Sequence, residues 1–137
     1  FTPDGRHLIA GFTRHTDDKP GCRVAYFSLD SAEAVEPLDA NPTEGVSDLA
    51  FSPDGQTLIA TVGDHTRSDG DLAARAKNGE VRVYVKDKPA PPPAEYGPWE
   101  LQAVLKDHGG LVYGAAFAPD GRTFSTIGAD STLIVWD

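Results

Sequence analysis

The sequence predicts an all-β protein built from repeated sheets of four short antiparallel strands. The motif Phe-x-Pro-Asp-Gly occurs three times, beginning at Phe1, Phe51 and Phe117, and a β-prone run follows each copy. Fourteen glycines and 11 prolines among 137 residues indicate frequent turns. Self-similarity at intervals of this size, together with short apolar runs, favours an array of small stacked sheets.

Each Pro-Asp-Gly triplet is expected to form the turn of a β-hairpin. Proline presets φ at the first corner, aspartate can bond the backbone ahead, and glycine tolerates positive φ. We therefore expect strands before the turn at 46–51 and 112–117, and strands after it at 7–10, 57–60 and 123–126.

Two further strands complete each repeat. The apolar runs at 23–27, 81–84 and 133–137 form the far side of a second hairpin. One more strand fits between successive repeats, at 34–38 and 99–105. The first repeat then has two strands and each of the next two has four.

The third repeat resembles a known family. It contains Asp-His-Gly-Gly-Leu-Val-Tyr-Gly-Ala-Ala-Phe-Ala-Pro-Asp-Gly at 107–121, followed by Gly-Ala-Asp-Ser-Thr at 128–132 and by Trp136-Asp137. This segment is similar to the WD repeat, the blade-forming unit of one class of β-propellers. Tyr84 and Phe27 take the place of the tryptophan in the two earlier repeats.

The resemblance implies β-propeller blades made of four-stranded antiparallel sheets. The chain would supply about 2.5 blades, whereas propellers typically close with about 4–8. Because the chain also lacks Met and begins with Phe, we expect an incomplete propeller, the fragment of a larger one whose remaining blades belong to the same parent chain. Its predicted parts are a partial blade (1–30), a second repeat (31–87), a proline-rich connection (88–98) and a third repeat (99–137).

The resemblance also implies a structural tetrad in the third repeat, formed by His108, Thr126, Asp130 and Trp136. His108 would bond Asp130, and Thr126 would link the imidazole to the indole N–H. An acid, an imidazole and a hydroxyl in a line resemble a hydrolase triad, but a triad also needs an exposed nucleophile and an oxyanion hole. We therefore predict no catalytic residue and no enzyme.

The two earlier repeats depart from this tetrad. Pro42 aligns with His108, and we align Thr61 of the second repeat and Gly11 of the first with Thr126. These departures predict that the first two sheets rely on apolar packing alone.

Long polar loops predict a contact surface, because loops carry function more often than cores do. The first hairpin loop is expected at 12–21 and its counterpart in the second repeat at 62–79. In WD-repeat propellers such loops emerge beside the central channel, where Ser47 and Tyr113 align. The candidate partner-binding residues are Arg14, His15, Asp17, Asp18, His65, Arg67, Asp69, Asp71, Ser47 and Tyr113.

Two segments admit another interpretation. Asp64, Asp69 and Asp71 offer oxygen ligands, but their spacing misses the EF-hand order and Arg67 intrudes, so we predict neither a metal nor a cofactor. The segment 88–98 contains P-x-x-P, which could be a polyproline ligand, although a stiff surface connection is the simpler interpretation.

Charge and hydropathy exclude several classes of partner. The formal net charge is −9, and no Lys or Arg lies between Arg23 and Arg67, where eight acidic residues occur. Such a segment repels a phosphate backbone, so no nucleic acid is expected. No apolar run approaches the ~20 residues of a membrane span, and the first residues lack the features of a signal peptide. We expect a soluble protein with no membrane partner.

Two functions fit this pattern. The leading one is a non-catalytic scaffold for protein–protein interaction with unidentified protein partners. The alternative is a regulatory or substrate-gating propeller attached to an enzyme domain elsewhere on a longer parent chain, because Phe-Ser-Pro-Asp-Gly also resembles repeats of propellers that accompany peptidases.

Overall fold

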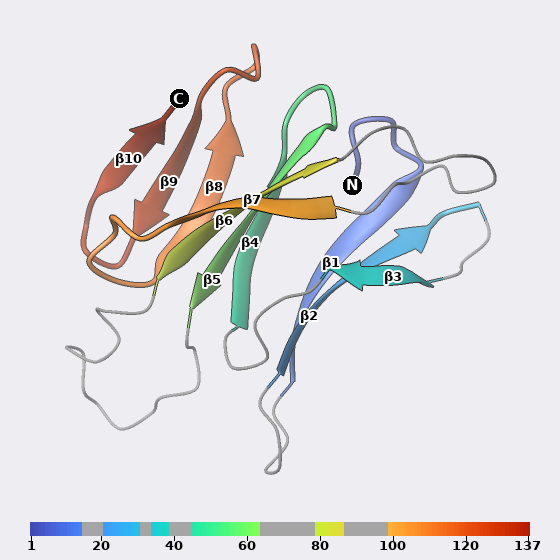
Figure 1. Cartoon of the computed structure of the whole chain (residues 1–137), viewed down its shortest axis with the longest axis horizontal. Helices are drawn as coiled ribbons and strands as arrows, with labels where there is room; N and C mark the ends of the chain where they lie inside the picture. The colour runs from blue at the N-terminus through green and yellow to red at the C-terminus, as the bar shows by residue number, and fades with distance from the viewer. Residues whose placement is uncertain (15–20, 31–33, 39–44, 64–78, 87–98) are drawn as a thin grey trace.

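A computed structural model shows ten β-strands in three antiparallel sheets, which confirms the predicted fold class (Figure 1). It describes residues 1–14, 21–30, 34–38, 45–63, 79–86 and 99–137. None of these residues is helical, so this part contains no helix that could span a membrane. The strands are β1 (His7–Arg14), β2 (Gly21–Ser28), β3 (Ala34–Leu38), β4 (Gly45–Phe51), β5 (Thr57–Gly63), β6 (Glu80–Lys86), β7 (Trp99–Leu105), β8 (Val112–Phe117), β9 (Phe124–Gly128) and β10 (Leu133–Trp136).

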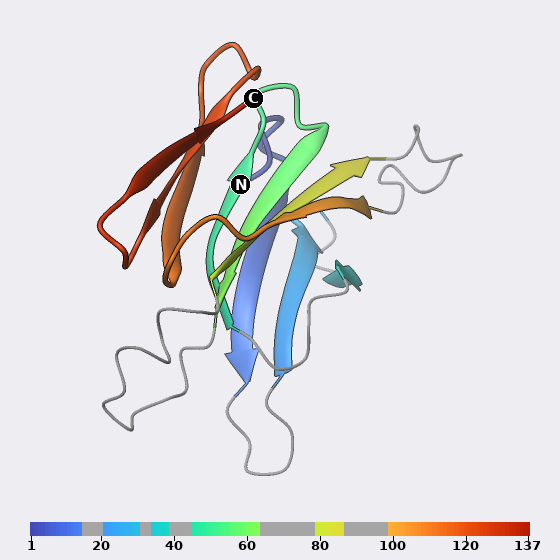
Figure 2. The same ribbon diagram turned by 60° about the vertical axis from the view of Figure 1, so that its left-hand side comes forward.

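The three sheets follow one another along the chain and lie side by side (Figures 1 and 2). The first sheet has the order β1-β2-β3, the second β4-β5-β6-β7 and the third β8-β9-β10. Among the described residues, the first sheet has no counterpart of β4, and the third has no counterpart of β7. The second sheet is therefore the complete four-stranded unit. The predicted grouping of two, four and four strands is wrong, because residues 34–38 pair with β2 of the first sheet and residues 99–105 pair with β6 of the second.

Two loops begin later in the structure than the sequence predicted, because the preceding strands are longer. Residues 12–14 belong to β1, where their backbone pairs with that of residues 21–23. Val62 belongs to β5, is only 1% exposed and pairs with Glu80. In the first hairpin the ladder continues into the polar residues Thr13 and Arg14, because backbone pairing does not require apolar side chains at every position. In the second hairpin the ladder continues because Val62 still packs in the core.

The three Pro-Asp-Gly turns adopt the geometry that the motif predicts. Gly5, Gly55 and Gly121 have φ of 69°, 68° and 71°, a region that glycine enters without steric cost. In the second turn, Ser52 Oγ donates to Asp54 Oδ1 (2.6 Å) and accepts from Thr57 N (2.9 Å). Hydrogen bonds to Asp54 from the Ser52 hydroxyl and the Gln56 amide lower the pKa of this carboxyl.

The third turn lacks this hydroxyl. Ala118 stands in the place of Ser52, and the turn is closed by backbone bonds from Gly121 N to Ala118 O and from Ala118 N to Thr123 O, both 2.9 Å. Asp120 still accepts from Arg122 N at 3.1 Å. The side-chain hydroxyl thus reinforces a turn that the backbone can form without it.

The core lies between neighbouring sheets, where apolar side chains of one sheet pack against those of the other. At the first interface, Ile9 and Val24 of the first sheet join a cluster with buried residues of β5 and β6. At the second interface, Ile59 and Val81 of the second sheet cluster with Val112 of β8. Leu58, Ile59, Val24 and the others of this core are at most 8% exposed.

Gly11 marks a close approach between the first two sheets. A Cβ atom added to Gly11 would lie 2.8 Å from Val46 Cγ1. The side chain of Val46 thus occupies the space that a residue larger than glycine would need on β1, and this contact fixes how closely β1 and β4 approach.

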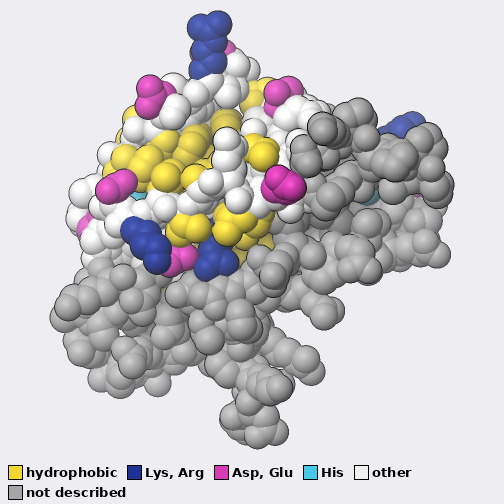
Figure 3. All heavy atoms as spheres, viewed as in Figure 1, with side chains coloured by type: hydrophobic (Ala, Val, Ile, Leu, Met, Phe, Trp, Pro, Cys, Tyr) yellow, Lys and Arg dark blue, Asp and Glu magenta, His cyan; other side chains and the backbone are white. Residues whose placement is uncertain are grey.

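The third sheet keeps the corresponding face exposed. Ile127, Leu133 and Val135 are 50%, 62% and 64% exposed, whereas Thr61 and Val81, at the positions of Ile127 and Leu133 in the second sheet, are at most 1% exposed. Figure 3 shows hydrophobic side chains gathered on the side of the molecule where β7–β10 lie.

Replacing the turn hydroxyl tests how much it contributes. We expect Ser52→Ala to lower the free energy of unfolding by about 1–2 kcal/mol, because two hydrogen bonds beside the chain reversal are lost. The reciprocal variant Ala118→Ser is expected to raise it by a few tenths to about 1 kcal/mol. Urea unfolding measures both changes. If Ala118→Ser destabilises as much as Ser52→Ala does, the hydroxyl is not the cause.

Candidate functional site

Four side chains of the third repeat form one hydrogen-bonded network. His108 lies between β7 and β8, Thr126 on β9, Asp130 in the β9–β10 turn and Trp136 at the end of β10. His108 Nε2 is 2.7 Å from Thr126 Oγ1, and Trp136 Nε1 donates to the same hydroxyl oxygen at 2.9 Å. His108 Nδ1 is 3.1 Å from Asp130 Oδ2.

Asp130 determines which atoms of this network donate hydrogen bonds and which accept them. It accepts from the Thr132 hydroxyl (2.7 Å), the Thr132 amide (3.0 Å) and the Gly109 amide (2.7 Å). The Thr132 hydroxyl first, and then these amides and the His108 ring, hold the pKa of Asp130 well below its usual range against an opposing desolvation effect. An ionised Asp130 accepts the Nδ1 proton of His108, so Nε2 accepts the hydroxyl proton of Thr126.

The hydroxyl at the end of this line is buried. Thr126 is 1% exposed and His108 is 6% exposed. Because Thr126 Oγ1 already serves the imidazole and the indole, it is not placed to attack a substrate from solvent. The arrangement can join β9, β10 and the segment before β8, and its chemistry is that of a structural network.

The strand pairing in the second sheet shows that the predicted alignment of Thr61 with Thr126 is wrong. Leu49 of β4 pairs with Ala60, and its counterpart Ala115 of β8 pairs with Thr126. Ala60, and not Thr61, therefore lies at the position of Thr126, and in the first repeat Ala10 takes that place instead of Gly11. A shift of one residue moves a side chain to the opposite face of the sheet, and Thr61 faces the third sheet.

A different polar cluster occupies the second sheet, so the expectation of apolar packing alone is wrong there. Arg82, which is 8% exposed, forms an ion pair with Glu80 (Nη2–Oε2, 3.0 Å), and Lys106 Nζ lies 2.5 Å from Glu80 Oε1. Burial disfavours the guanidinium, but hydrogen bonds with Glu80 and Tyr84 outweigh it and raise the pKa of Arg82. The alternation Glu80-x-Arg82-x-Tyr84 was the sequence signal for this cluster.

Two β-bulges place Ser47 and Tyr113 at the same end of adjacent strands. The register shifts between Val46 and Asp48 on β4 and between Val112 and Gly114 on β8. Each shift inserts one residue into the ladder and re-aims its side chain. Tyr113 is 54% exposed, and Ser47 is half-buried. Both strands begin at the lower end of the sheets in Figure 1.

Asp48 connects these two bulges. Its Oδ2 accepts a hydrogen bond from Ala115 N of β8 at 3.0 Å, and its Oδ1 accepts from Leu49 N at 2.9 Å. One carboxylate thus bonds both its own strand and the neighbouring sheet.

The structure does not describe the side chains of the remaining predicted contact residues. Arg14 is the last residue of β1, and its backbone pairs with Gly21. The other seven lie outside the described residues, namely His15, Asp17, Asp18, His65, Arg67, Asp69 and Asp71. Ser47 and Tyr113 are therefore the predicted contact residues whose side chains the structure describes, and they occupy equivalent bulges of β4 and β8.

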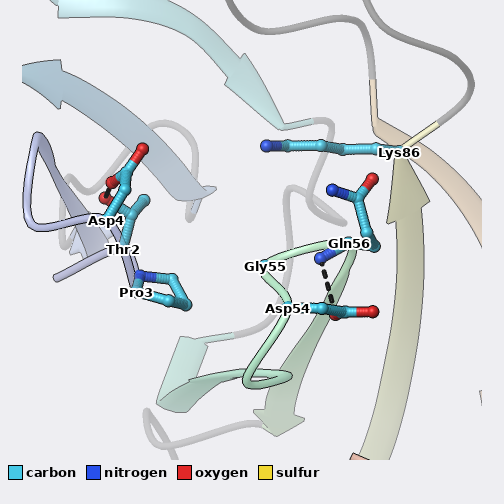
Figure 4. Close-up of a pocket in the computed structure, with 7 residues that line it drawn as sticks. All are labelled: Thr2, Pro3, Asp4, Asp54, Gly55, Gln56 and Lys86. Atoms are coloured by element: carbon cyan, nitrogen blue, oxygen red, sulfur yellow. Dashed lines mark hydrogen bonds between the residues drawn. The ribbon is translucent and has the colours of Figure 1, made fainter.

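A polar pocket that the sequence did not predict lies at the opposite end of the sheets. It has a volume of about 160 Å³ and is lined by Thr2, Pro3, Asp4, Asp54, Gly55, Gln56 and Lys86. Figure 4 shows Lys86 extending into the space between the first two turns. Its Nζ lies 5.4 Å from the centre of the Trp99 ring, and desolvation lowers its pKa although Asp4 opposes the shift. No three metal-ligating side chains converge in this or any other described part of the chain.

Comparison with known proteins identifies one family and several proteins with similar sequences. The family described as "WD domain, G-beta repeat" matches residues 34–66 and 99–137. "WD repeat and SOCS box-containing protein 1" of Xenopus tropicalis is 30% identical over 96 residues, which are 69% of this chain and 17% of that protein. "Intraflagellar transport protein 122 homolog" of Danio rerio is 32% identical over 91 residues, which are 66% of this chain and 6% of that protein.

Solved structures show the same fold at lower identity. "Structure of U3-55K" matches with a TM-score of 0.67 at 15% identity, over 98% of this chain and 33% of that one. "Crystal structure of RRP9 WD40 repeats" matches with a TM-score of 0.66 over the same shares. The chain thus spans a third of these structures and less than a fifth of the two relatives.

Removing the shared hydroxyl tests the network of the third repeat. We expect Thr126→Val to lower the free energy of unfolding by about 2–3 kcal/mol, because it leaves the buried Nε2 of His108 and the indole N–H of Trp136 without this partner. Thr61→Val is the matched control, since Thr61 is equally buried but makes one long bond of 3.4 Å to the Asp48 carbonyl. Equal losses in chemical denaturation would show that the network adds no stability.

Proposed function

Because the chain belongs to the WD40-repeat family of β-propellers, we propose that it acts as a non-catalytic scaffold for protein–protein interaction. Propellers of this family are typically protein-interaction scaffolds. The absence of catalysis is part of the proposal, and it is supported by the burial of Thr126, the hydroxyl that an acid–imidazole–hydroxyl line would activate.

The partner-binding surface lies, in this proposal, where β4 and β8 begin. Tyr113 carries the argument, because it is an aromatic side chain that is 54% exposed on a strand rather than on a loop. Tyrosine combines a large apolar ring with a polar tip and loses little conformational entropy on binding, so it is enriched among the residues that dominate binding energy. Ser47, in the equivalent bulge of β4, adds a hydroxyl to the proposed surface.

Polar residues predicted from the sequence extend this surface. Arg14 ends β1, and the segments after β1 and β5 start at the strand ends that pair with Gly21 and Gly45. We assign to the same surface His15, Asp17, Asp18, His65, Arg67, Asp69 and Asp71. Protein-binding patches usually combine an aromatic-rich core with a polar rim, and these polar residues would suit such a rim.

Affinity capture with matched variants tests this function. Native chain, Tyr113→Ala and Leu101→Ala are used as bait; Leu101, on β7, is 49% exposed and serves as the control for loss of an exposed apolar side chain. We expect Tyr113→Ala to weaken retention of the captured protein by at least about tenfold, with Leu101→Ala unchanged. Equal retention by all three baits would contradict a binding role for Tyr113.

A further inference from the structure

Asp48 is the described side chain whose carboxylate joins one sheet to the next through a backbone amide. Its Oδ2 accepts from Ala115 N at 3.0 Å, and its Oδ1 accepts from Leu49 N at 2.9 Å. Asp48 follows Ser47 directly, and Ala115 lies two residues after Tyr113. The bond therefore ties together the backbone beside both residues of the candidate surface.

The edge positions of β4 and β8 explain why such a bond is needed. An edge strand has a hydrogen-bonded neighbour on one side only, so backbone groups on its other side have no partner strand. An amide that stays unpaired in a partly buried position costs free energy. A carboxylate supplies two acceptor oxygens, and its hydrogen bonds are stronger than those of a neutral acceptor. Asp48 uses one oxygen for each bulged strand.

The equivalent positions show that this bond is specific to the second interface. Leu49 is the counterpart of Ala115 on β4, and its amide is bonded by Asp48 of its own strand. Gly114 is the counterpart of Asp48 on β8, so the third sheet offers no carboxylate there. A Cβ added to Gly114 would lie 3.6 Å from Asp48 Oδ2, an ordinary van der Waals contact, which shows that the carboxylate reaches the surface of β8.

From this geometry we propose that Asp48 is a positioning residue that fixes the spacing of Ser47 and Tyr113 and thereby determines which partner their surface accepts. The proposal rests on the proposed function. Apolar contacts at the second interface are not directional, so they tolerate a small slide of β4 along β8. The hydrogen bond removes that freedom, and a preorganised surface binds its partner without paying for ordering.

The test compares Asp48→Ala with Asp48→Asn, which keeps one acceptor oxygen, in the full chain. Asp120→Ala is the control, because Asp120 also accepts from a nearby amide but lies in the turn that follows the far end of β8. The first readout is hydrogen exchange at the Ala115 amide. We expect it to accelerate about tenfold in Asp48→Ala and to stay close to native in Asp120→Ala. Asp48→Asn is expected to be intermediate, because its single neutral oxygen can accept from one of the two amides only.

The second readout is retention of the protein captured by the native chain. We expect Asp48→Ala to weaken it although Tyr113 is intact, and Asp48→Asn to retain more of it than Asp48→Ala does. Unchanged exchange at Ala115 in Asp48→Ala, or unchanged retention despite faster exchange, overturns the proposal. An effect of Asp48→Asn larger than that of Asp48→Ala on either readout also counts against it. Faster exchange throughout β5 would mark general unfolding, and Asp48→Asn then carries the test.

The proposed function fails in a different way. If Tyr113→Ala retains the captured protein as well as the native chain does, Tyr113 is not a binding residue. Exchange at Ala115 would still report whether Asp48 holds β8. Conversely, unchanged exchange in Asp48→Ala removes the positioning role and leaves the test of Tyr113 untouched.

Discussion

The rest of the structure depends on one constraint, which is that each small sheet must bury a face against its neighbour. Three or four short strands cannot enclose a core of their own, so Ile9 and Val24, and then Ile59 and Val81, find apolar cover only in the next sheet. Fully burying such a side chain contributes about 1.5–3 kcal/mol. Gly11 shows how tight the contact is, because Val46 fills the space that any larger residue would need.

Polar groups add hydrogen bonds and an ion pair, which are directional, whereas apolar packing is not. The network around Thr126 joins the strands of the third sheet, the Glu80–Arg82 ion pair lies on β6, and Asp48 crosses the second interface. All three act where side chains are wholly or partly buried, so their partners are fixed by geometry. The exposed Tyr113 lies at a strand end where a bulge interrupts the ladder. The proposed binding surface thus lies at the irregular ends of the sheets.

The repeated motif made most of the fold predictable, because each Pro-Asp-Gly turn fixes the strands on either side of it. All ten predicted strands exist, and His108, Thr126, Asp130 and Trp136 meet. The errors came from features that motif spacing does not encode. Assigning Thr61 to the place of Ala60 was a register error of one residue, which changes the face of the sheet. The bond from Asp48 to Ala115 joins two sheets, and alternation within a strand says nothing about the neighbouring sheet.

Residue-resolved native-state hydrogen exchange tests most directly whether packing between sheets governs stability. The second sheet is covered on both faces, so the account predicts the slowest exchange for bonded amides of β5 and β6, and faster exchange in the first and third sheets. The third sheet holds the His108–Thr126 network but leaves Ile127 and Leu133 exposed. Slower exchange in β9 than in β5 would contradict the account, because the polar network and not the interface would then set stability.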